Sequence, residues 1–176
     1  MDDMRIHIGW ATALCLAGVA AVASANDSTA ERASLTGLTS LSVVVEDLAA
    51  VAGKSGLTVS ALQTDVERRL RQAGIAVTSD ADAYLYVHVT VADPGASLPL
   101  PYVVDVALMQ EVTLPRSVRA RTPLQCATWW VNSLGMAGPD RLRTGVSDRV
   151  AEFVDQFIRA YRAVNSATVA EPQRRP

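Results

Sequence analysis

The chain has 176 residues, and its 16 lysine and arginine residues nearly balance 18 aspartate and glutamate residues, for a net charge of -2. This length fits one domain with a hydrophobic core of its own. A balanced charge gives no long-range field that would attract nucleic acid or an anionic membrane surface, so the composition argues against both as partners.

The N-terminal residues have the pattern of a secretory signal peptide. Arg5 precedes an uncharged run over residues 8–22, and Ala23-Ser24-Ala25 has the small-x-small form of a cleavage site. We predict a signal peptide over residues 1–25, cleavage after Ala25, and a periplasmic or secreted protein. The alternative is an uncleaved anchor, although the run is shorter than the ~20 residues that span a membrane comfortably. Later apolar runs are shorter still, so we expect no membrane span after cleavage.

The remaining sequence divides into three parts. Small and polar residues fill 26–38 and predict a flexible leader. A single α+β domain is expected over residues 39–165, followed by a disordered tail over 166–176 that has nothing to bury. Cys126 is the only cysteine after the predicted cleavage site, so the domain must be held by its core without an internal disulfide.

The clearest element is a strand over residues 102–114, bracketed by Pro101 and Pro115. Its apolar side chains recur at every second position, which indicates one buried and one solvated face. One solvated face is typical of an antiparallel sheet that is covered on a single side. Residues 84–91 alternate in the same way. Two more strands are predicted, over residues 41–48 and over residues 124–131 with an extension at most to 134.

A first helix is predicted over residues 57–74, where apolar side chains recur at steps of three and four residues. Thr58 or Ser60 can cap its free amides, and Gly74 is placed to end it. A brief extended segment at residues 75–77 follows.

A second helix is predicted from Pro139 to Asn165, with an apolar stripe sustained over about seven turns. Gly145 is a weak position inside this helix. We expect Gly135 and Gly138 to break the chain before the helix begins.

The predicted order is therefore β-α-β-β-β-α. It indicates an α+β fold in which an antiparallel meander and one further strand form a sheet, with two helices packed on one face. The stretches VVVEDL, LQTDVERRLRQAGI, DAYLYVHV, CATWW and VAEFVDQFIRAYRAVN resemble a type of small, uncharacterised exported bacterial protein. In element order, residues 40–165 also resemble periplasmic assembly modules, such as the lipopolysaccharide-assembly lipoproteins and the amino-terminal domain of TolB. This resemblance implies the fold and assigns no functional residue.

The two adjacent tryptophans must point to opposite sides of the sheet. Ala127, Trp129 and Val131 form the more apolar set, so we assign Trp129 to the core and Trp130 to the solvated face. Strand alternation then gathers a candidate partner surface on that face, consisting of Tyr84, Tyr86, His88, Met109 and Trp130.

An aromatic sheet face without helices over it is typical of a binding or dimer surface. The leading hypothesis is an exported, non-enzymatic binding or assembly module that contacts a protein, either itself or an envelope component, through this face or an edge strand. The simpler alternative is that cross-strand aromatic pairs only stabilise an exposed face.

Two other functions stay open. An apolar ligand or lipid carrier would need a pocket between sheet and helices, around Met136, Leu142 and Trp129. A cysteine-dependent enzyme would need Cys126 to meet His88 across the sheet, with Asp105 orienting the imidazole. The two residues would lie two strand spacings apart, roughly 9–10 Å, which is too long for a hydrogen bond between the thiol and the imidazole.

We predict no catalytic residue and no cofactor. We also predict no metal site, because His88 has no second histidine or paired cysteine to join it after residue 25.

Overall fold

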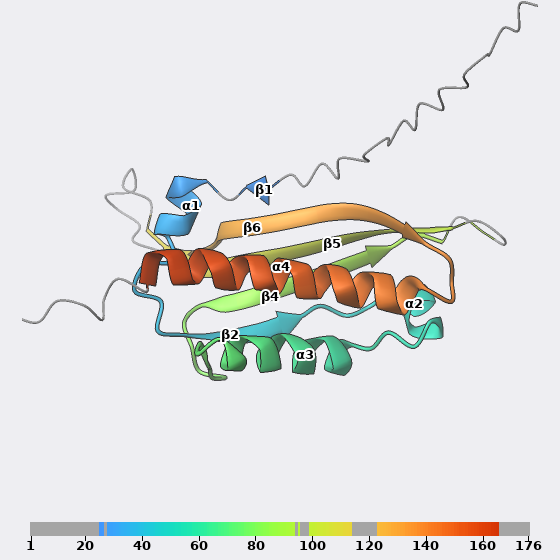
Figure 1. Cartoon of the computed structure of the whole chain (residues 1–176), viewed down its shortest axis with the longest axis horizontal. Coiled ribbons are helices and arrows are strands. Elements are labelled where there is room, and N and C mark those ends of the chain that lie inside the picture. Colours follow the sequence, from blue (N-terminus) through green and yellow to red (C-terminus); the bar gives the residue numbers. More distant parts are fainter. Residues whose placement is uncertain (1–24, 27, 94, 96–98, 114–122, 166–176) are drawn as a thin grey trace, which may run out of the picture.

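The computed structural model describes residues 25–26, 28–93, 95, 99–113 and 123–165 (Figure 1). The predicted tail and all of the predicted signal peptide except Ala25 lie outside these residues. The elements in chain order are β1 (Ala25–Asn26), α1 (Thr29–Ala33), β2 (Ser40–Val45), α2 (Ala50–Lys54), α3 (Val59–Gln72), β3 (Ala76–Val77), β4 (Tyr84–Val91), β5 (Leu100–Val112), β6 (Leu124–Ala137) and α4 (Leu142–Asn165). The six longer elements follow the predicted β-α-β-β-β-α order, and the α+β fold class is confirmed.

The strands form one six-stranded sheet in the order β1-β6-β5-β4-β2-β3. β4, β5 and β6 pair antiparallel, which is the predicted meander. β2 is the further strand and runs parallel to β4. A parallel pair needs a long crossover connection, and α3 lies in the connection between these two strands. The short strands β1 and β3 pair along the two edges.

The helix boundaries follow from local chemistry. Thr58 caps α3 because its hydroxyl accepts a hydrogen bond of 3.2 Å from the Ala61 amide. Gly74 ends the helix with a φ of 84°, a left-handed conformation that favours glycine. α4 begins at Leu142, three residues later than predicted, and ends at Asn165 as predicted.

β6 corrects the prediction that Gly135 breaks the chain. The strand continues through Gly135 to Ala137 because Gly135 lies opposite Tyr102 on β5. A Cβ atom on Gly135 would lie 2.3 Å from Cζ of Tyr102, and one on Gly145 of α4 would lie 3.1 Å from the same side chain's hydroxyl oxygen. Both glycines therefore make room for one buried aromatic ring, as glycine often does inside a strand.

A β-bulge changes the side-chain alternation near the start of β6. Leu108 pairs with Trp129, whereas Met109 pairs with Ala127, so Thr128 is the extra residue. Trp129 is fully buried, as predicted. The grouping of Ala127 with Trp129 is wrong, because the bulge turns Ala127 to the other face, where it is exposed.

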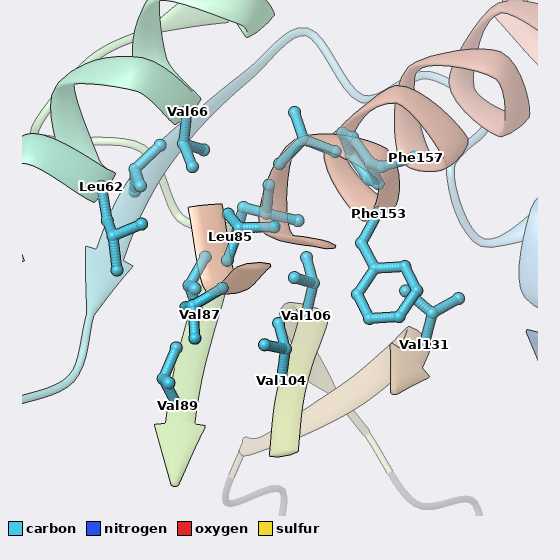
Figure 2. Packing of buried hydrophobic residues seen from close by; sticks show 14 of the residues in the cluster. Leu62, Val66, Leu85, Val87, Val89, Val104, Val106, Val131, Phe153 and Phe157 are labelled. Carbon is cyan, nitrogen blue, oxygen red and sulfur yellow. The ribbon is translucent and has the colours of Figure 1, made fainter. Parts of the chain in front are cut away.

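The core lies between the sheet and the helices. Alternate residues of the strands join buried side chains of α3 and α4 in one apolar cluster. Figure 2 shows Val104 and Val106 of β5 near Phe153 and Phe157 of α4. Phe157 meets Trp129 edge to face, with 5.2 Å between ring centroids. α4 lies along the strands and covers this side of the sheet (Figure 1).

The prediction of a flexible leader over residues 26–38 is wrong for the described part of that segment. Leu35 is fully buried in the core cluster. The Asn165 side chain donates to the Leu35 carbonyl at 2.9 Å and accepts from the Gly37 amide at 2.8 Å. Ser28 and Glu31 form a capping box at the start of α1. Burial of Leu35 and these bonds to α4 hold the segment in place.

Candidate functional site

The side of the sheet opposite the core is called the outer face here. None of the strand residues on the outer face belongs to the core cluster. Each of the four described helices either supplies residues to the core or contacts an element on the core side of the sheet. The outer face carries mixed polar, aromatic and apolar side chains: Val44, Glu46, Tyr84, Tyr86, His88, Thr90, Val103, Asp105, Ala107, Met109, Trp130, Asn132, Leu134 and Met136.

All five predicted surface residues lie on the outer face, and each is half-buried. Tyr84 of β4 pairs directly with Met109 of β5. Tyr86 and Trp130 both pair with Ala107, one from each side. They are thus two strand spacings apart, roughly 9–10 Å. The sheet brings the five residues to one face of three strands, with small Ala107 between the two aromatic rings.

Glu46 joins this surface and was missed by the sequence analysis. Its amide donates to the Val87 carbonyl at 3.0 Å, which places it beside β4 just after the end of β2. The hydroxyl of Tyr86 donates to Glu46 Oε2, and His88 Nδ1 lies 2.5 Å from the same oxygen. The only signal for this contact would have been the parallel pairing of β2 with β4, which strand patterns do not specify.

The hydrogen bond from Tyr86 lowers the pKa of the Glu46 carboxyl group. The same bond raises the pKa of the Tyr86 phenol to about 12, because the neighbouring carboxylate favours the protonated hydroxyl. The rings of Tyr86 and His88 are stacked, with 6.3 Å between centroids and an interplanar angle of 3°. Thr90 Oγ1 lies 2.8 Å from His88 Nε2. These four residues, Glu46, Tyr86, His88 and Thr90, form what we call the polar strip.

The order hydroxyl, imidazole, carboxylate in the polar strip matches the order of groups in a hydrolase triad. The side chains of His88 and Glu46 are 35% and 45% exposed, however. Electrostatic catalysis relies on a site from which water is excluded. The polar strip is therefore better explained as a hydrogen-bonded network that holds side chains on a solvated face.

The structure does not bring Cys126 and His88 together. Cys126 lies opposite Gln110 on β5, whereas His88 lies opposite Asp105, five residues further along. That separation is roughly 17 Å, and residues an odd number apart on a strand point to opposite faces. No thiol–imidazole pair can form in this arrangement. That the protein is not an enzyme stays a prediction.

The pocket expected around Met136, Leu142 and Trp129 is not formed by these residues. Leu142 and Trp129 are fully buried in the core, and only Met136 lines a hollow. This hollow is an open surface groove of about 540 Å³ beside the start of α4, where Tyr102 and Arg141 also line it. Close packing between the layers leaves these two core residues no pocket to line.

The end of β6 adds an apolar patch to the outer face. Leu134 and Met136 are 71% and 66% exposed, the highest values among the large apolar side chains identified as exposed in the described part of the chain. They pair with Val103 and Pro101 of β5. The sequence analysis did not place them on this face because it ended the strand at or before residue 134.

Comparison with known proteins gives a resemblance only to solved structures. No family model matches the sequence, and no curated protein matches it. A minor lipoprotein from Acinetobacter baumannii is 13% identical, with a TM-score of 0.37, over 72% of this chain and 94% of that one. A dodecameric variant of PelC from Paraburkholderia phytofirmans is also 13% identical, with a TM-score of 0.38, over 70% of this chain and 86% of that one.

Within the described ranges, each helix is either too short or too polar to cross a bilayer.

Proposed function

We propose that this protein is an exported, non-enzymatic binding or assembly module that docks a protein partner on the outer face of its sheet. The proposal rests mainly on one observation. The outer face combines half-buried Trp130 and Tyr86 with strongly exposed Leu134 and Met136, and no described helix packs over it. Aromatic and apolar side chains gathered on one open face are typical of protein interaction sites.

The chemistry of the face favours a protein over a small ligand. Small-molecule sites are concave and enclose most of the ligand, whereas the outer face is an open sheet surface. Tryptophan and tyrosine are also the side chains that most often dominate protein interfaces. Export is supported by the signal-peptide pattern of residues 1–25 and stays a prediction.

The test places a photoreactive phenylalanine analogue at position 130 and, as a control, at Glu152 on the exposed side of α4. Irradiation of producing cells should give a defined cross-linked protein at position 130 and none at 152. Tyr86→Ala and Trp130→Ala should then abolish co-purification of that protein while the melting transition stays within a few degrees. Cross-linking at neither position, or co-purification unaffected by both substitutions, would contradict the proposal.

A further inference from the structure

Among the described residues, the C-terminal half of β6 is a sheet edge with no strand beside it on the side away from β5. β6 runs from Leu124 to Ala137, yet its outer neighbour β1 pairs only with Trp130 and Val131. Along residues 132–137 the described chain offers no strand on that side. Edge strands of this kind present free N–H and C=O groups that readily pair with another chain.

The predicted processing site decides whether this edge stays open. β1 is antiparallel to β6, with Ala25 opposite Val131. Residues that precede Ala25 are therefore the ones that would continue along residues 132–137. Cleavage after Ala25 would remove them together with Ala25 itself, so only Asn26 of β1 would stay beside β6, opposite Trp130.

The composition of β6 favours pairing with a second copy of itself. The strand LQCATWWVNSLGMA contains no charged residue, whereas exposed edges are usually protected by charged side chains such as lysine. Two copies can therefore pair without placing like charges opposite each other.

The positions of the exposed side chains select one register. If Gly135 lies opposite Gly135 of the second copy, Leu134 of each copy lies opposite Met136 of the other. Directly opposite side chains have Cβ atoms roughly 4.5–5.5 Å apart, close enough for contact. Leu134 of each copy would then contact Met136 of the other, so these exposed side chains are covered at two places on the outer face of the joined sheet.

We propose that two processed chains pair antiparallel through residues 133–137, centred on Gly135, and join their sheets into one. This inference goes beyond the proposed function, because the second copy joins at the edge of β6 and leaves the outer face around Trp130 open to another protein. The interface is isologous, since the same strand serves both copies, and it closes as a dimer.

The first test measures oligomeric state by light scattering and sedimentation on the exported, processed protein. A dimer is expected at micromolar to tens-of-micromolar concentration. Leu134→Lys should convert it to a monomer that still unfolds in one cooperative transition, because Leu134 is mostly exposed in the single chain. Leu124→Lys is the matched control: it places the same charge on the same strand, outside residues 133–137, and should leave the dimer intact.

The second test fixes the register in a Cys126→Ser background. A mixture of Leu134→Cys and Met136→Cys chains should form a disulfide between the two variants faster than either variant forms one with itself. Monomeric processed protein, or faster self-linking of Leu134→Cys, would overturn the proposal. A monomer that still cross-links a different protein at position 130 would overturn only the dimer and leave the proposed function standing.

Discussion

Gly135→Ala is expected to destabilise the fold through a single clash. The added methyl group would lie 2.3 Å from Cζ and 2.7 Å from Cε2 of Tyr102, and carbon atoms do not approach so closely. Tyr102 is only 7% exposed and Gly145 of α4 lies against its hydroxyl end, so the ring can move only toward the groove that it lines beside the start of α4. A buried ring must therefore shift, or the β5–β6 pairing must open locally.

The magnitude can be bounded from two opposing effects. Overpacking a core costs about 1–3 kcal/mol. Replacing glycine restricts the unfolded chain and returns about 0.4–1 kcal/mol. A net loss of about 1–2 kcal/mol would lower Tm by about 2–8 °C for a domain of this size. Urea unfolding and calorimetry measure both quantities, and Gly53→Ala serves as the control, since its Cβ would meet nothing within 4 Å.

A Tyr102→Phe background separates the two glycines. Gly145→Ala conflicts chiefly with the Tyr102 hydroxyl oxygen, so in the phenylalanine background it should become stabilising by up to about 1 kcal/mol, the gain expected for alanine over glycine in a helix. Gly135→Ala conflicts with ring carbons that phenylalanine retains, so it should stay destabilising there. If Gly135→Ala is as stable as the parent protein, or is rescued equally by Tyr102→Phe, the ring is not what requires glycine at position 135.

Two further predictions concern contacts that the sequence analysis missed. Leu35→Ala should lower the free energy of unfolding, measured in urea, by about 2–5 kcal/mol, as for a fully buried leucine. Leu134→Ala, at an exposed position, should lower it by almost nothing. Equal effects would mean that Leu35 is not packed in the core. Because the folded-state pKa of Tyr86 is raised to about 12, its contribution to stability is complete below about pH 10 and is lost as the pH rises through the folded value. Glu46→Gln should shift one phenol of the alkaline absorbance titration back toward pH 10, and an unchanged titration would contradict the Tyr86–Glu46 bond.

Side-chain periodicity predicted the elements with the simplest environments. β4 matches its predicted range, and β5 is displaced by only two residues, because each strand has one face on the core and one on solvent. Thr58 and Gly74 marked the ends of α3 through capping chemistry that acts within a few residues. Patterns of this kind are local, so a single sequence carries them.

The errors arose where a distant residue decided the local structure. Gly135 continues a strand only because Tyr102 fills the space above it, and the two are 33 positions apart. Leu35 is buried only because α4 lies nearby, although the capping box of Ser28 and Glu31 was a signal that could have identified α1. The bulge at Thr128 depends on how β5 and β6 pair, which the sequence of β6 alone does not reveal.

The same non-local pairing divides the outer face into two halves with different chemistry. In the polar strip, Tyr86 already donates to Glu46 and Thr90 is already bonded to His88 Nε2, so a partner that contacts these residues must replace bonds that are already made. On β6, Leu134 and Met136 have no such contacts to lose, and covering them removes apolar surface from water. The favourable free energy of binding a partner therefore comes mainly from the β6 half of the outer face. That half includes Trp130 and adjoins the open edge, which is why one strand can serve both the proposed function and the proposed dimer.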